Sequence, residues 1–127
     1  MQSLREGSGT VICIGEEAVR LNLRCAFLKE HGWQVLSSVT ANEGIIRFSE
    51  EQVDAAILDF DSDTSQAALI AGELKRLRPQ VSVIIVIPED KVLHDDILQC
   101  ADVVVPSSDQ SHLLSALESL RRDRRNR

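Results

Sequence analysis

The chain has 127 residues, of which 43% are hydrophobic and 27% are charged, a composition that indicates one globular domain and excludes a disordered chain. Its formal net charge is −6, although five arginines fall among the last seven residues. Residues 1–120 therefore carry 9 basic and 19 acidic side chains, and this acidic body argues against nucleic-acid binding by this chain alone.

Two further observations bear on where the chain works. The longest apolar run, residues 83–87, is far too short to span a bilayer, and residues 1–6 lack the apolar stretch of a secretory signal. The cysteines Cys13, Cys25 and Cys100 are scattered among apolar residues, which is typical of buried free thiols in a reducing compartment. We expect a cytoplasmic protein that is not associated with a membrane.

Short apolar runs alternate five times with segments of helical periodicity. The apolar runs predict strands at residues 10–14, 33–37, 55–58, 81–87 and 102–105. The periodic segments predict helices from the end of the first strand to Gly32, then at residues 41–51, 67–77, 92–100 and 109–120. Continuous apolar strands separated by helices are typical of a parallel sheet that is covered on both faces.

The helices also show candidate core positions and caps. The first helix is expected to bury Val19, Leu23, Ala26, Phe27 and Leu28, and the second to bury Ile45, Ile46 and Phe48. Candidate N-caps are Thr40 or Asn42 for the second helix and Ser108 or Asp109 for the last.

The fold expected from these elements is a doubly wound (βα)5 domain with a five-stranded parallel sheet of order 2-1-3-4-5, as in flavodoxin-like proteins. We expect residues 1–9 to be a flexible lead, residues 10–121 to form the domain, and residues 122–127 to be a basic tail or the start of a linker.

Asp59 follows the apolar run at residues 55–58, so it should lie at the carboxyl end of a buried strand. That edge of an open α/β sheet is where ligands bind. The neighbouring strand ends carry Glu16 and Glu17 after the first strand, and no lysine or arginine at any of the other ends. The sequence therefore predicts an acidic cluster around Asp59.

Four segments carry a family resemblance: residues 12–17 (ICIGEE), 28–33 (LKEHGW), 53–59 (VDAAILD) and 100–105 (CADVVV). Their order and spacing resemble the landmarks of response-regulator (CheY-like) receiver domains of two-component systems, from about Val11 to Leu120.

This resemblance implies that Asp59 is the phosphoacceptor. The acidic pair that holds Mg²⁺ in the family falls on Gly15 and Glu16, or on Glu16 and Glu17 after a one-residue shift, and the metal-binding carbonyl falls on Asp61. The implied metal ligands are Glu16, Asp59 and Asp61. Because the first acid is missing, we expect weak Mg²⁺ binding and no other cofactor.

The sequence departs from the family at the residues that report phosphorylation. The switch Ser/Thr position holds Ile87 (or Pro88), the aromatic position holds Val104, and the lysine position holds Ser107 (or Val105). The chain therefore resembles an atypical receiver, or pseudo-receiver.

We expect a signal-transduction domain that binds a protein partner without phosphorylation and is not an enzyme. The alternative is a phosphorelay receiver that a histidine kinase phosphorylates at Asp59. A flavodoxin-type enzyme is a more distant alternative, because Glu16 and Glu17 would repel a bound phosphate. The expected partner or self-association surface comprises the fourth helix, fifth strand and fifth helix, with His94, Asp95, Asp96, Gln99 and the region up to Arg121.

Overall fold

The computed structural model describes residues 9–60, 64–88 and 99–125 of the chain. The strands are β1 (Thr10–Gly15), β2 (Gln34–Ser38), β3 (Ala55–Asp59), β4 (Ser82–Ile87) and β5 (Val103–Pro106). The helices are α2 (Ala18–Glu30), α3 (Ala41–Glu50), α4 (Thr64–Leu77) and α6 (Gln110–Arg125). The helix predicted at residues 92–100 lies outside the described residues, apart from helical residues at 99 and 100.

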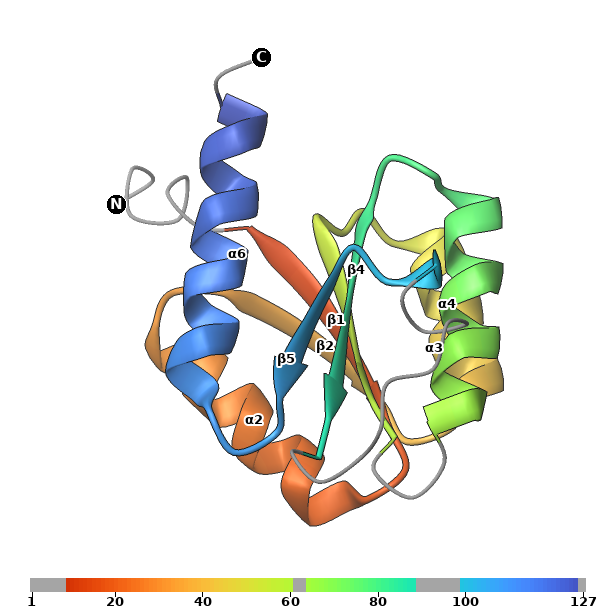
Figure 1. The fold of residues 1–127 in the computed structure, drawn as a ribbon, viewed down its shortest axis with the longest axis horizontal. Helices are drawn as coiled ribbons and strands as arrows, with labels where there is room; N and C mark the ends of the chain where they lie inside the picture. The colour runs from red at the N-terminus through yellow and green to blue at the C-terminus, as the bar shows by residue number, and fades with distance from the viewer. Residues whose placement is uncertain (1–8, 61–63, 89–98, 126–127) are drawn as a thin grey trace.

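The five strands form one parallel sheet in the order β2-β1-β3-β4-β5, which confirms the predicted topology (Figure 1). Each strand ends within one residue of its predicted end. Residues of β1, β3 and β4 are almost entirely buried, since helices cover both faces of the sheet. That burial explains why these strands are continuous apolar runs without polar alternation.

Helices cover both faces of the sheet (Figure 1). On one face, α2 and α6 pack on a cluster that includes Cys13, Ile57 and Leu113. On the other, α3 and α4 pack on a cluster that includes Ile14 and Phe48. Successive strand residues point to opposite faces, so each strand contributes alternate side chains to the two clusters.

The buried stripe of α2 differs from the predicted one. Val19 and Leu23 are 66% and 65% exposed, so their assignment to the core was wrong. Ala26 is also exposed, Phe27 is half-buried, and only Leu28 of the predicted set is fully buried. The stripe that faces the sheet consists of Leu21, Arg24, Cys25 and Leu28. Both stripes have helical spacing, and the one containing an arginine is the one that the sheet covers.

The helix α3 matches its prediction more closely. Thr40 caps it, because its hydroxyl accepts a hydrogen bond from the Glu43 amide at 3.3 Å. Phe48 is fully buried, but Ile46 is 55% exposed, so the prediction that Ile46 points inward was wrong. Gly44, instead of Ile46, is buried where α3 packs on the sheet. A Cβ there would approach the Ile14 side chain to 2.6 Å, so α3 lies very close to β1.

The ends of the remaining helices follow the predicted signals. Gly32 follows α2 with φ of 92°, a left-handed conformation that glycine adopts without strain. Asp109 precedes α6 and its Oδ1 accepts a hydrogen bond from the His112 amide at 3.0 Å. The helix α6 continues to Arg125, so it includes part of the segment predicted to be a basic tail. Within the described ranges, no helix is long and apolar enough to cross a membrane.

Candidate functional site

Asp59 is the last residue of β3, at the carboxyl edge of the sheet. Its register partner on β1 is Gly15 and its partner on β4 is Val86. The parallel register therefore brings the end of β1 beside Asp59, as the sequence predicts. A Cβ at Gly15 would come within 3.1 Å of the Asp59 carbonyl oxygen, so the two backbones are in close contact there.

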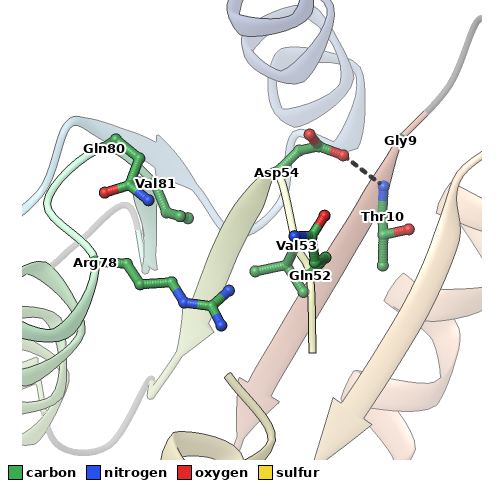
Figure 2. Close-up of a pocket in the computed structure, with 8 residues that line it drawn as sticks. All are labelled: Gly9, Thr10, Gln52, Val53, Asp54, Arg78, Gln80 and Val81. Atoms are coloured by element: carbon green, nitrogen blue, oxygen red, sulfur yellow. Dashed lines mark hydrogen bonds between the residues drawn. The ribbon is translucent and has the colours of Figure 1, made fainter. Parts of the chain in front are cut away.

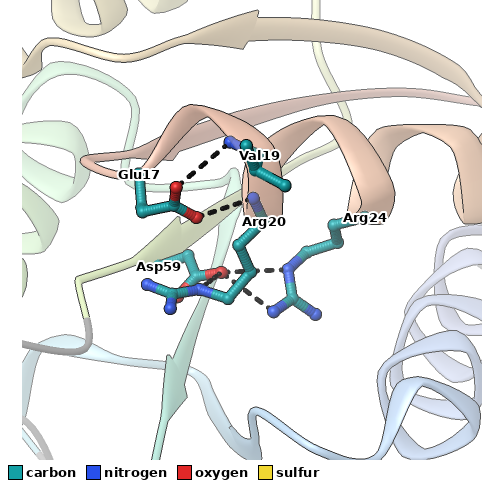
Figure 3. Close-up of polar contacts among 5 residues, drawn as sticks. All are labelled: Glu17, Val19, Arg20, Arg24 and Asp59. Carbon is teal, nitrogen blue, oxygen red and sulfur yellow. Dashed lines mark hydrogen bonds and ion pairs between the residues drawn. The ribbon is translucent and has the colours of Figure 1, made fainter.

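The Asp59 carboxylate lies beneath α2 and binds two arginines from that helix (Figure 3). Arg24 donates to Asp59 Oδ2 from Nη2 at 2.8 Å and from Nε at 3.2 Å. Arg20, one helical turn earlier, donates to the same oxygen from Nε at 3.3 Å. The side chains of Asp59 and Arg24 are each only 3% exposed, whereas that of Arg20 is 33% exposed.

The charge of Asp59 is therefore compensated inside the protein. An ionised carboxylate is costly to bury unless it is paired and hydrogen-bonded, and guanidinium N–H groups supply both. All three hydrogen bonds converge on Oδ2, while Oδ1 is buried and has no hydrogen-bond partner among residues 9–60, 64–88 and 99–125. Oδ2 thus accepts three hydrogen bonds, while Oδ1 could still accept one.

These two arginines were not predicted, because a cation was expected only at the strand ends. The compensating charge comes from a helix, on the stripe that contacts the sheet. A signal was present: Arg20 and Arg24 are spaced i, i+4, and Arg24 lies between Leu21 and Leu28 on one helical face. An arginine at a core position of an amphipathic helix needs a buried partner, and Asp59 is that partner.

The two glutamates after β1 differ in their contacts. Glu16 is exposed. Glu17 caps α2, with Oε1 accepting from the Arg20 amide at 2.8 Å and Oε2 from the Val19 amide at 3.4 Å (Figure 3). A carboxylate in this position stabilises the positive end of the helix. Glu17 therefore contributes to the beginning of the helix that carries both arginines.

The predicted Mg²⁺ ligands can be followed only in part. Asp61 lies outside the described residues, Glu16 is exposed, and Asp59 is buried with its Oδ2 bound to arginine. Among the described residues, no group of three or more His, Cys, Asp or Glu side chains is placed to hold a metal ion. The Mg²⁺ site at Glu16, Asp59 and Asp61 remains a prediction.

The positions that differ from the receiver pattern lie along the same edge. Ile87 ends β4, is 7% exposed and pairs in register with Pro106. The Ser107 amide donates to the Ile87 carbonyl oxygen at 2.8 Å, so the two positions are adjacent. Val104 is half-buried in β5. Ile87 and Val104 are hydrocarbon and Ser107 is neutral, so none of these side chains brings a positive charge toward Asp59.

The predicted partner surface is described in part, at residues 99 and 100, β5 and α6. His94, Asp95 and Asp96 lie outside the described residues, while Gln99 is exposed and Cys100 is half-buried. The use of this surface remains a prediction.

A polar cavity of about 390 Å³ opens at the opposite edge of the sheet (Figure 2). Asp54 there accepts from the Thr10 amide at 2.9 Å, and Arg78 donates to the carbonyl oxygens of Ser49 and Glu51. The residues that line the cavity are Gly9, Thr10, Gln52, Val53, Asp54, Arg78, Gln80 and Val81. These bonds tie together loops at the amino-terminal ends of the strands, whereas ligands of open α/β sheets bind at the carboxyl ends.

Comparison with known proteins identifies the fold of this chain but no family by sequence. No protein-family model matches the chain, and no curated protein matches it in sequence. The fold, however, matches solved receiver domains. A response regulator receiver domain protein (CheY-like) from Methanospirillum hungatei aligns with a TM-score of 0.81 and 17% identity, over 92% of this chain and 96% of that one.

Two further structures agree. A response regulator receiver domain protein from Clostridium thermocellum aligns with a TM-score of 0.77 and 21% identity, over 92% of this chain and 96% of the other. The response regulator TrrA from Thermotoga maritima, solved in complex with Mg²⁺-BeF, aligns with a TM-score of 0.77 and 20% identity, over 87% and 97% of the two chains. By structural similarity, this chain therefore has the fold of a response-regulator receiver (CheY-like) domain.

Proposed function

We propose that this chain is a receiver-like signal-transduction domain that acts by binding a protein partner, without phosphorylation of Asp59. One observation carries the proposal: Asp59 Oδ2 is already bound by Arg24 and Arg20, and the Asp59 side chain is 3% exposed. The cation that neutralises the carboxylate is thus part of the chain, where a receiver would use a dissociable metal.

The surroundings of Asp59 support a role that does not require phosphoryl transfer to it. A carboxylate oxygen must approach phosphorus in line with the leaving group, and the added phosphoryl carries nearly two negative charges that need new partners. Transfer to Oδ2 would break the bonds from Arg24 and leave a buried guanidinium without its anion, which is costly. The hydroxyl and lysine partners of the family are replaced by Ile87 and Ser107. The chain therefore has fewer groups that could stabilise an added phosphoryl group.

The alternative, a phosphorelay receiver phosphorylated at Asp59 with a weak Mg²⁺ site, has two observations in its favour. Arg20 and Arg24 place two guanidinium groups beside Asp59, and guanidinium pairs well with phosphoryl oxygens. Asp59 Oδ1 receives no hydrogen bond from the described residues, so it remains as an attacking oxygen. The Thermotoga relative, solved with Mg²⁺-BeF, makes this alternative worth testing directly.

The remaining parts of the proposal rest on the sequence. We propose a non-catalytic cytoplasmic domain whose partner, or second copy, binds the surface formed by residues 92–100, β5 and α6. Charged and amide side chains there, such as Asp95 and Gln99, would set the orientation of binding around aliphatic contacts.

The deciding experiment exposes the wild type, Asp59→Asn and Asp54→Asn to acetyl phosphate and Mg²⁺. Asp54 is a matched control, since it is half-buried but lies at the opposite edge of the sheet. Intact-mass spectrometry would detect a phosphoryl adduct, and amide chemical shifts with sedimentation would detect a change of state. We expect no adduct and identical association for all three proteins. A labile adduct on the wild type and Asp54→Asn, absent from Asp59→Asn, would establish the phosphorelay alternative instead.

A further inference from the structure

Two of the three cysteines meet between α2 and the sheet. Cys13 lies on β1 and is fully buried, and Cys25 lies on the buried stripe of α2 and is 6% exposed. Both belong to the apolar cluster on the α2 side of the sheet. The two thiols lie on facing elements of this cluster and are close enough for their side chains to shift each other's pKa. Both are free thiols in this structure.

Polar neighbours make the two thiols unlike one another. The Cys13 side chain lowers the pKa of Cys25 to about 7 against the opposing effect of burial, with help from the positive charges of Lys29 and Arg24 and a hydrogen bond from Ser37. The Cys25 side chain, together with burial, raises the pKa of Cys13. Ser37 is the register partner of Cys13 on β2, so Cys25 contacts two adjacent strands.

We propose that Cys13 and Cys25 form an oxidisable dithiol, in which a small peroxide converts the two thiols into an intrachain disulfide that ties β1 to α2. The two thiols, one a stabilised thiolate and the other keeping its proton, supply the nucleophile and the resolving thiol that this chemistry needs.

The reaction balances with hydrogen peroxide as the oxidant. The Cys25 thiolate attacks one peroxide oxygen, the O–O bond breaks, and hydroxide leaves and takes up a proton to form water. Cys25 is then a sulfenic acid. The Cys13 sulfur attacks the Cys25 sulfur, the S–O bond breaks, and a second water leaves with the Cys13 proton. Overall, two thiols are oxidised to one disulfide and one peroxide is reduced to two waters.

The third cysteine makes the prediction specific. Cys100 packs against the cluster on the α3 and α4 side of the sheet, so the sheet separates it from Cys13 and Cys25. Of the three intrachain pairings of these cysteines, only Cys13 with Cys25 joins two residues on the same side of the sheet. The proposal also places the cross-link next to Arg24, the residue that holds Asp59, but it does not depend on whether Asp59 is phosphorylated.

The experiment uses the folded 127-residue chain, as the wild type and as Cys100→Ser. Each protein is treated with hydrogen peroxide, remaining thiols are alkylated under denaturing conditions, and peptides are mapped without reduction. We expect a Cys13–Cys25 cross-link in both proteins, with the loss of the mass of two hydrogen atoms, a monomeric chain, and full reversal by dithiothreitol. In Cys25→Ala, shown by circular dichroism to be folded, we expect Cys13 to remain a reduced thiol.

Several results would overturn the proposal. These are recovery of both thiols in alkylated form, a cross-link that includes Cys100 or joins two chains, and oxidation of Cys25 beyond the sulfenic acid while Cys13 stays reduced. The peptide map of the wild type decides among them without any variant, so a failure of Cys25→Ala to fold leaves the test intact.

Discussion

The buried ion pair between Arg24 and Asp59 gives the sharpest test of the structure. We consider Arg24→Met, which keeps much of the side-chain volume but removes the charge. Breaking a buried pair by removing one partner costs about 3–5 kcal/mol, because the other charge stays buried without compensation. Arg20 still donates to Asp59 at 3.3 Å, but its side chain is 33% exposed. We therefore expect a loss near the lower end, about 3 kcal/mol of the free energy of unfolding.

The double variant Arg24→Met/Asp59→Leu completes the cycle. Replacing both members of a buried pair by apolar residues is often neutral or even stabilising. We expect the double variant to recover most of the stability lost in Arg24→Met, so that its cost is well below the sum of the costs of Arg24→Met and Asp59→Leu. Arg20→Met is the matched control on the same helix, and its partial exposure should limit its cost to about 1 kcal/mol.

The free energies of unfolding would be measured by urea denaturation, followed by circular dichroism. The four proteins of the cycle and the Arg20→Met control should unfold with similar m-values. If Arg24→Met costs less than about 1 kcal/mol, or if the single effects simply add in the double variant, then Arg24 and Asp59 are not a buried pair and our reasoning about this site is wrong.

Three further predictions concern helix packing, helix capping and metal binding. Gly44→Ala should cost about 1 kcal/mol in urea denaturation, because strain against Ile14 outweighs the gain in helix propensity; a more stable variant would contradict the close contact of α3 with β1. Thr40→Ala should cost about 1 kcal/mol through loss of the α3 cap, measured in the same way, while an unchanged midpoint would mean that the cap contributes nothing. Titration with Mg²⁺ should shift the amide signals near Asp59 only weakly, because Gly15 supplies no carboxylate and Arg24 holds Asp59 Oδ2; tight stoichiometric binding would show that the glutamates after β1 complete a metal site.

Much of the fold is encoded locally, and the sequence was sufficient for those parts. The runs at residues 11–14 and 83–87 are rich in β-branched residues and lack polar alternation, and these are buried strands in the structure. Thr40 and Gly32 mark helix ends because capping and left-handed φ depend on a few adjacent residues. The parallel topology followed from the alternation of strands and helices, since few layouts satisfy right-handed crossovers.

The surroundings of Asp59 were decided by the tertiary structure. The sequence placed Asp59 at a strand end, but α2 has two stripes of helical spacing, and periodicity alone favoured the one containing Val19 and Leu23. Packing against the sheet selected the other stripe and brought Arg24 to Asp59, 35 residues away in the chain. Local patterns describe how each residue relates to its neighbours within one element. The buried carboxylate selects its partner from the side chains that reach it in the folded protein, and only the packed structure contains that information.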